Sequence, residues 1–161
     1  MKEVNLKSVM GIFLLFPVLG LLFSILIYAD YNSFKVINVN GFKNNNIIYD
    51  IDSIENNTND KSISIKGWAV KKNKNLSTVK TYVSLRNVNT SQILQMNTVK
   101  EIRKDVTSKF NDSYNYDNCG FFAKFNKSSL KNKGQYEICI LYLSDNSSDF
   151  VPTNKFIEIN Q

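Results

Sequence analysis

The chain has 161 residues, and its 20 Lys and Arg residues against 14 Asp and Glu residues give a formal net charge of +6. It contains no histidine, which excludes Ser-His-Asp and Cys-His catalysis, ordinary zinc sites and histidine-based pH switching. The basic residues are scattered and form no stripe with interleaved aromatics, so we expect no nucleic-acid partner. Since the sequence also presents no catalytic or metal-binding constellation, we expect a protein that is not an enzyme and uses no cofactor.

An uncharged apolar stretch occupies residues 8–29. As an α-helix it would be about 33 Å long, which matches a hydrocarbon core of about 30 Å. Backbone groups in lipid need internal hydrogen bonds, so the stretch must be helical there. The competing interpretation is a cleaved signal peptide, whose apolar region usually has only about 7 to 15 residues. The sequence therefore predicts an uncleaved transmembrane helix in contact with the lipid bilayer.

The charges on either side of this stretch indicate its orientation. Lys2 and Lys7 precede it, and Asp30 follows it directly. Cytoplasmic flanks of transmembrane helices are enriched in Lys and Arg. We therefore expect residues 1–7 to form a cytoplasmic tail and the C-terminal part to lie outside the cytoplasm, in a single-pass protein of the cell membrane.

The rest of the chain alternates apolar and polar residues in short segments separated by Asn, Gly, Ser and Asp clusters. This pattern is typical of the strands of a β-sandwich or barrel. We expect residues 30–46 to be a linker or first strand, and residues 47–161 to form a β-sandwich domain. A helix of one or two turns is expected within residues 100–110. The predicted strands are residues 34–39, 47–54, 62–70, 79–85, 93–99, 119–125, 136–143 and 155–159.

The segment that leads into the strand at residues 136–143 predicts a corner. In immunoglobulin-like sandwiches, a tyrosine at the start of a strand hydrogen-bonds through its hydroxyl to the preceding corner. Leu130 would then fill the core, Gly134 would allow the turn and Tyr136 would form the corner. The alternative is a strand tyrosine without such a role.

Four short motifs follow one another along the chain: Gly67-Trp68-Ala69, Arg103-Lys104-Asp105-Val106, Gly120-Phe121, and Leu130 followed by Gly134-Gln135-Tyr136. Their order resembles a small immunoglobulin-like β-sandwich module of bacterial envelope proteins, similar to domains appended to surface-polysaccharide glycosyltransferases. The likeness covers roughly residues 47–159. It implies an all-β, immunoglobulin-like antiparallel sandwich with a non-catalytic accessory or binding role, and it carries over no catalytic residue.

Four side chains are candidates for a ligand surface, namely Tyr82, Arg86, Trp68 and Arg103. Aromatic faces can stack on sugar rings, and a guanidinium group suits carboxylate or phosphate. Tyr82 lies on the polar face of the strand predicted at residues 79–85, and Arg86 continues that face. The alternatives are structural: Trp68 as core packing, and Arg103 as the ion-pair partner of Asp105 that holds a loop.

Cys119 and Cys139 are an even pair in a domain expected to lie outside the cytoplasm, where disulfides form. A disulfide between the sheets and two free buried thiols both fit the pattern. Cys139 has the side-chain parity of Leu141 and not that of Ile138 and Ile140, so the two cysteines need not both point inward.

We therefore expect a membrane-anchored extracytoplasmic β-sandwich with a non-catalytic binding or accessory role at the bacterial cell envelope. Its expected partners are the lipid bilayer, through residues 8–29, and a cell-surface polysaccharide or another envelope protein. The alternative is an interaction subunit of a membrane complex, in which the transmembrane helix itself makes the contact.

Overall fold

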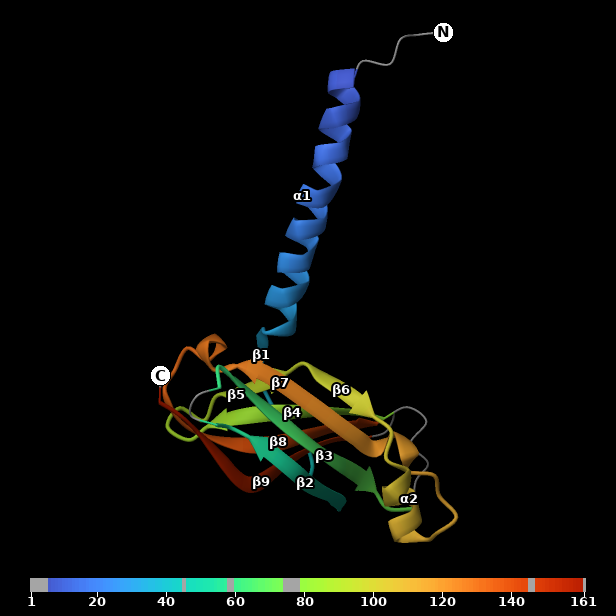
Figure 1. Cartoon of the computed structure of the whole chain (residues 1–161). Coiled ribbons are helices and arrows are strands. Elements are labelled where there is room, and N and C mark those ends of the chain that lie inside the picture. Colours follow the sequence, from blue (N-terminus) through green and yellow to red (C-terminus); the bar gives the residue numbers. More distant parts are fainter. Residues whose placement is uncertain (1–5, 45, 58–59, 74–78, 145–146, 161) are drawn as a thin grey trace. The chain divides into compact units, whose positions relative to one another are not determined.

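A computed structural model of the chain describes residues 6–44, 46–57, 60–73, 79–144 and 147–160 (Figure 1). Side chains are described from residue 13 onward. The chain divides into two compact units, Met1–Tyr31 and Asn32–Gln161. The expected cytoplasmic tail, with Lys2 and Lys7, lies outside the described side chains.

The first unit is a single long helix, α1 (Leu6–Tyr31), which extends two residues beyond the predicted stretch at each end. Its segment Phe13–Tyr31 is long and apolar enough to cross a membrane, and its side chains are not buried inside the protein. The hydroxyl of Ser24 donates to the carbonyl oxygen of Gly20 at 2.9 Å, so this polar group is satisfied within the helix. The prediction of one apolar helix of membrane-spanning length is confirmed.

The second unit consists mostly of antiparallel strands in two sheets. A five-stranded sheet has the order β1-β5-β4-β8-β9, and a four-stranded sheet has the order β2-β3-β7-β6. The predicted all-β, antiparallel class is confirmed for this unit. The strands are β1 (Phe34–Ile37), β2 (Ile47–Glu55), β3 (Ser62–Lys71), β4 (Lys80–Asn87), β5 (Ile93–Met96), β6 (Thr98–Glu101), β7 (Gly120–Asn126), β8 (Gly134–Ser144) and β9 (Ser147–Ile159).

One hydrophobic core lies between the two sheets. Alternate residues of the central strands point into it and are fully buried, with each large side chain contributing roughly 1.5–3 kcal/mol. Phe34 of β1 and Phe125 of β7 meet there edge to face, with ring centroids 5.4 Å apart. The fully buried central residues include Ile63, Ile65, Val83, Leu85, Ile138 and Ile140.

The strand predicted at residues 93–99 is two strands in the structure, because the chain changes sheets at Asn97. β5 pairs with β4, whereas β6 pairs with β7 of the other sheet. The hydroxyl of Thr98 accepts a hydrogen bond from the backbone N–H of Val83 at 3.0 Å and donates to the carbonyl oxygen of Met96 at 3.2 Å. It thus supplies an acceptor to β4 at the point where β5 leaves the sheet. The alternation of side chains continues through Asn97, so periodicity alone does not reveal the break.

The last strand, β9, begins eight residues before the predicted strand at residues 155–159. Pro152 interrupts its sequence pattern, and proline is normally confined to sheet edges or bulges. In the structure Pro152 pairs with Cys139 next to a shift in register, and Asn154 adopts a left-handed conformation with φ of 56°. The bulge lets the strand continue past the proline.

Of the two alternatives for residues 30–46, the structure contains a strand. β1 pairs with β5 at one edge of the five-stranded sheet. At the opposite edge, Lys43 forms a parallel bridge with β9: its N–H donates to Ser148 O at 3.0 Å, and its carbonyl accepts from Phe150 N at 2.9 Å. Residues 36–44, the crossing segment, therefore link both edges of this sheet.

Candidate functional site

The four predicted ligand-surface residues lie in two separate regions. Trp68 and Arg103 belong to the four-stranded sheet and to the short helix α2 (Lys104–Phe110) beside it. Tyr82 and Arg86 lie on β4, in the five-stranded sheet. They therefore do not form one site.

Trp68 is buried, with only 4% of its surface exposed. On β3 it has the opposite parity to Ile63 and Ile65, so it lies on the outer face of the sheet, where α2 covers it. Phe110 packs edge to face on it with ring centroids 5.9 Å apart, and Lys109 Nζ lies 5.3 Å from the ring centroid. The packing alternative for Trp68 is confirmed, because the side chain belongs to the hydrophobic core cluster and also packs against Phe110 of α2.

Arg103 forms the ion pair with Asp105 that the structural alternative predicted. Its Nε and one terminal nitrogen donate to the two carboxylate oxygens of Asp105 at 2.9 and 2.7 Å, and the other nitrogen donates to Asp52. The hydrogen bond with Asp105 raises the pKa of Arg103, and the same bond lowers the pKa of Asp105. Arg103 is therefore paired with both carboxylates.

Packing explains why three of the sequence motifs occur together. Asp52 reaches Arg103 because β2 has a bulge between Ile51 and Ser53. A Cβ atom on Gly67 would lie 2.7 Å from the ring of Phe121, and one on Gly120 would lie 2.6 Å from Cγ of Arg103. The two glycines are thus sites of close approach, and the first three motifs form one packed cluster.

The corner predicted before β8 is present. The hydroxyl of Tyr136 donates to the carbonyl oxygen of Asn132 at 2.7 Å, and the side chain is 1% exposed. Leu130 belongs to the core, and Gly134 has a φ of 124°, which side chains rarely adopt. The predicted hydroxyl-to-backbone hydrogen bond of Tyr136 is confirmed.

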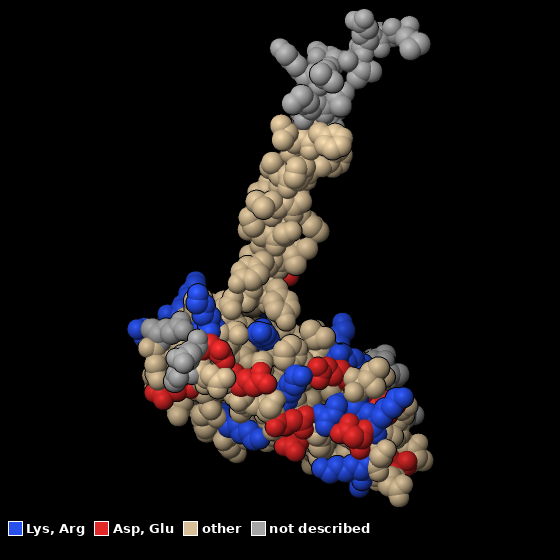
Figure 2. Space-filling view, in the orientation of Figure 1, with Lys and Arg blue, Asp and Glu red and all other residues tan. Residues whose placement is uncertain are grey.

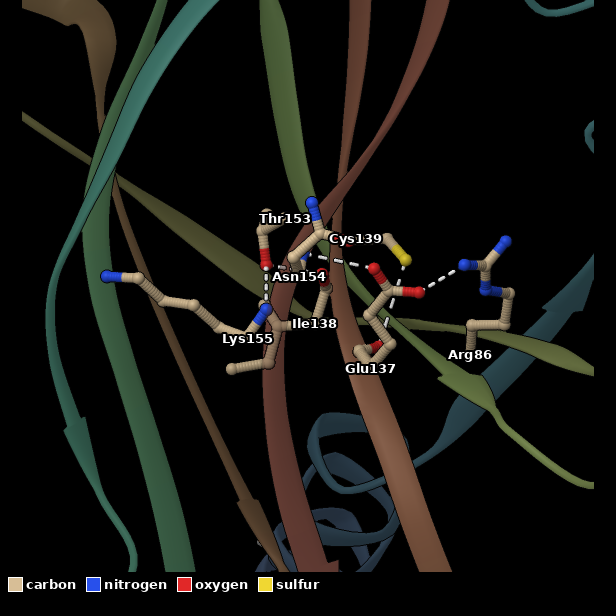
Figure 3. Close-up of polar contacts among 7 residues, drawn as sticks. All are labelled: Arg86, Glu137, Ile138, Cys139, Thr153, Asn154 and Lys155. Atoms are coloured by element: carbon tan, nitrogen blue, oxygen red, sulfur yellow. Dashed lines mark hydrogen bonds and ion pairs between the residues drawn. The ribbon is translucent and has the colours of Figure 1, made fainter.

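Arg86 crosses the outer face of the five-stranded sheet to Glu137, its register partner on β8 (Figure 3). The Glu137 side chain is 3% exposed, whereas that of Arg86 is 39% exposed. The backbone N–H of Asn154 at the β9 bulge donates to the other carboxylate oxygen at 3.0 Å. The buried charge is therefore both paired and hydrogen-bonded, as a buried carboxylate requires.

A groove of about 650 Å³ lies on this outer face beside Arg86. Its volume falls in the range typical of small-ligand sites. The crossing segment lines one side with Val36, Ile37, Val39 and three asparagines. The sheet contributes Arg86, Ile93, Phe150 and Pro152, and Ser91 and Gln92 complete the lining. Arg86 is the one predicted candidate that lines this groove.

A second hollow continues from the groove past Arg86 and Ser91. It has a volume of about 300 Å³ and reaches the half-exposed side chains of Val88 and Phe156. Tyr82 lies elsewhere and lines a small cavity of about 100 Å³. Sequence reasoning missed the groove because its wall and floor are far apart in the chain. The alternation of Ile37 and Val39 with asparagines is visible in the sequence, but only the fold brings it near Phe150.

Cys119 and Cys139 are both buried free thiols, so of the two alternatives the structure contains no disulfide. Cys119 directly precedes β7 of the four-stranded sheet, and Cys139 lies on the outer face of β8. Burial raises the pKa of each thiol to about 12. Both thiols are therefore neutral near pH 7.

Charges of both signs are interspersed over the visible face of the second unit, while the described part of α1 is almost free of them (Figure 2). Within the described ranges, no group of three or more Cys, Asp or Glu side chains is placed to hold a metal ion. Comparison with protein families, curated proteins and solved structures finds no match to the chain. The resemblance to envelope modules stays a prediction.

Proposed function

We propose that the chain is a membrane-anchored binding protein whose β domain recognises a surface polysaccharide outside the cytoplasm of a bacterium. The groove beside Arg86 is the observation that carries this proposal. It is the largest of the three hollows described above and is open to solvent, and its lining combines amide side chains with apolar ones. In this proposal the domain has no catalytic role.

The apolar helix supports the membrane anchor. Its segment Phe13–Tyr31 has the length and composition of a membrane span. Lys2 and Lys7 precede the apolar part of the helix and Asp30 follows it, which favours a cytoplasmic N-terminus. In this orientation the β domain lies outside the cytoplasm, on the envelope side of the membrane.

We also propose that the β domain is an immunoglobulin-like sandwich. The order β2-β3-β7-β6 corresponds to strands A-B-E-D of that fold, and β5-β4-β8-β9 corresponds to C′-C-F-G. The hydrogen bond of Tyr136 lies at the start of the strand equivalent to F, where the fold places its tyrosine corner. The domain differs from antibody domains in having free cysteines and its tryptophan on the strand equivalent to B. An experimental structure with another strand order would overturn this assignment.

Two experiments on the full chain test the proposal. In protoplasts of a bacterium that expresses it, added protease should degrade the β domain while the membrane is intact. In lipid nanodiscs, the chain should bind polysaccharide isolated from the surface of that bacterium. Protection of the domain from protease would overturn the orientation, and a lack of binding to every polysaccharide fraction would overturn the function.

A control with an unrelated transmembrane helix in place of α1 separates a tether from an interacting helix. Polysaccharide binding and membrane location should survive the exchange. If the exchange abolishes them while the β domain stays folded, the helix itself makes the functional contact.

A further inference from the structure

The groove on the five-stranded sheet is lined by amide side chains on one side and by an apolar floor on the other. Asn38, Asn40 and Asn44 of the crossing segment and Gln92 before β5 are all exposed. A carboxamide carries donors and an acceptor in one group. Such groups match ligands whose own groups both donate and accept, as sugar hydroxyls do.

The floor offers apolar contact at two positions on one face of β9. Phe150 pairs with Leu141, and Pro152 pairs with Cys139, so both side chains lie on the outer face and are partly exposed. The π-face of an aromatic ring suits the C–H face of a pyranose, and proline presents a similarly rigid apolar surface. The groove thus combines the two kinds of contact that a sugar ring needs.

The electrostatics of the groove favour an uncharged ligand. Among the described residues that line it, Arg86 is the one ionisable side chain, and its charge is balanced by Glu137 (Figure 3). An anionic group of a ligand would have to compete with this buried carboxylate for the guanidinium. Separating the pair would leave Glu137 charged and unpaired at 3% exposure, which is costly.

The position of the groove on the face of the sheet argues against an extended peptide. A peptide strand binds to backbone N–H and C=O groups at a free sheet edge. On this face the backbone groups of β4 and β8 are used by the ladders with their neighbours. Recognition in the groove therefore depends on side chains.

We propose that this groove binds a short uncharged segment of an oligosaccharide, with Asn40 and Gln92 bonded to its hydroxyls and Phe150 under a ring. This assignment rests on the proposed function and specifies its ligand class and its site. Asn38 has a supporting role, because its carboxamide oxygen accepts the N–H of Asn40 at 2.9 Å and fixes the turn of the crossing segment.

The test measures binding of the full chain in nanodiscs to two sets of immobilised oligosaccharides, one neutral and one carrying phosphate or uronic acid. Asn40→Ala and Gln92→Ala each remove one exposed amide. Each should weaken binding to a neutral oligosaccharide about five- to tenfold, as expected for one hydrogen bond. Asn132→Ala is the matched control, because Asn132 is exposed and does not line the groove, and the corner uses its backbone carbonyl, which the substitution keeps. It should leave binding unchanged.

The outcomes separate this assignment from the proposed function. Binding to neutral oligosaccharides that neither groove variant weakens would overturn the site but keep the function. Binding restricted to the acidic set, or to peptides, would overturn the ligand class. Absence of binding to every carbohydrate would overturn both. Phe150→Leu, which keeps an apolar side chain of similar size, should weaken neutral binding without altering the folded fluorescence of Trp68.

Discussion

Gly67 of β3 lies so close to the carbonyl oxygen of Asp50 on β2 that a Cβ atom on the glycine would be 2.2 Å from that oxygen. The bulge at Ile51 and Ser53 produces this approach, since it brings the β2 backbone over the glycine. The same bulge presents Asp52 to Arg103. One backbone irregularity thus connects a glycine requirement in β3 with an ion pair beside α2.

Gly67→Ala should therefore destabilise the β domain strongly, by about 3 kcal/mol or more, because neither the backbone nor the Phe121 ring can move freely in a packed sheet. Urea unfolding of the full chain in detergent micelles, followed by the fluorescence of Trp68, measures the change. Gly41→Ala is the control: Gly41 has a φ of 85°, but a Cβ atom on it would have no neighbour within 4 Å, so only backbone strain of about 1 kcal/mol applies. Equal effects of the two substitutions would contradict the close approach.

The ion pair of Arg103 with Asp105 should make stability depend on acid pH. The guanidinium lowers the pKa of Asp105 below its ordinary value of 3.8. The contribution of the pair is therefore present above about pH 4 and is lost as the pH falls through the lower pKa of the folded state. The stability difference between the native chain and Arg103→Gln should shrink between about pH 5 and pH 2. A difference that stays constant over this range would contradict the role of the pair.

The cysteines should be unreactive in the native protein. Both are buried, and burial raises the pKa of each thiol to about 12, so almost no thiolate exists near neutral pH. A colorimetric thiol reagent should detect no thiol in the folded chain within minutes and two thiols after unfolding in guanidinium. Cys139→Ser should reduce the number of thiols detected after unfolding from two to one. Failure to detect thiols in the unfolded, unreduced chain would indicate a disulfide.

Tyr136→Phe removes the hydroxyl that holds the corner before β8 and leaves the ring in place. The loss of its hydrogen bond to Asn132 O should cost about 1 kcal/mol of stability. Thermal unfolding in micelles measures this change. If thermal unfolding is unchanged, Tyr136 stabilises the domain through the packing of its ring alone.

Removal of two hydroxyl groups, one bonded and one not bonded within the described residues, should have different effects on stability. Thr98→Val should cost about 1–2 kcal/mol, because it leaves the N–H of Val83 without its acceptor. Ser84→Ala should be neutral or slightly stabilising, since Ser84 Oγ is the buried side-chain oxygen for which the described part of the chain provides no partner. If Thr98→Val costs no more stability than Ser84→Ala, the change of sheet at Asn97 does not depend on the hydroxyl of Thr98.

Local patterns in the sequence were sufficient to predict most of the elements. The apolar helix follows from its unbroken hydrophobicity, and strands such as β3 and β8 follow from apolar segments between polar turns. The corner at Tyr136 and the pair of Arg103 with Asp105 were also predictable, because each depends on residues close together in the chain.

The missed features depend on contacts between distant segments. The change of sheet at Asn97 leaves the side-chain alternation intact, so no local signal marks it. The start of β9 could not be predicted because Pro152 interrupts the strand pattern in the sequence. In the structure, the bulge accommodates this proline within the strand. The groove could not be predicted because its asparagines come from residues 38–44 and its floor from residues 150–152.

The crossing segment also determines how the β domain would respond to mechanical load. It lies near the start of that domain in chain order, and it is fastened to β5 through β1 and to β9 through Lys43. Tension applied from the N-terminal side reaches these attachments before it reaches β2 and the strands that follow. Because the same segment forms one wall of the groove, the binding surface would be deformed by a pull that leaves most of the core intact.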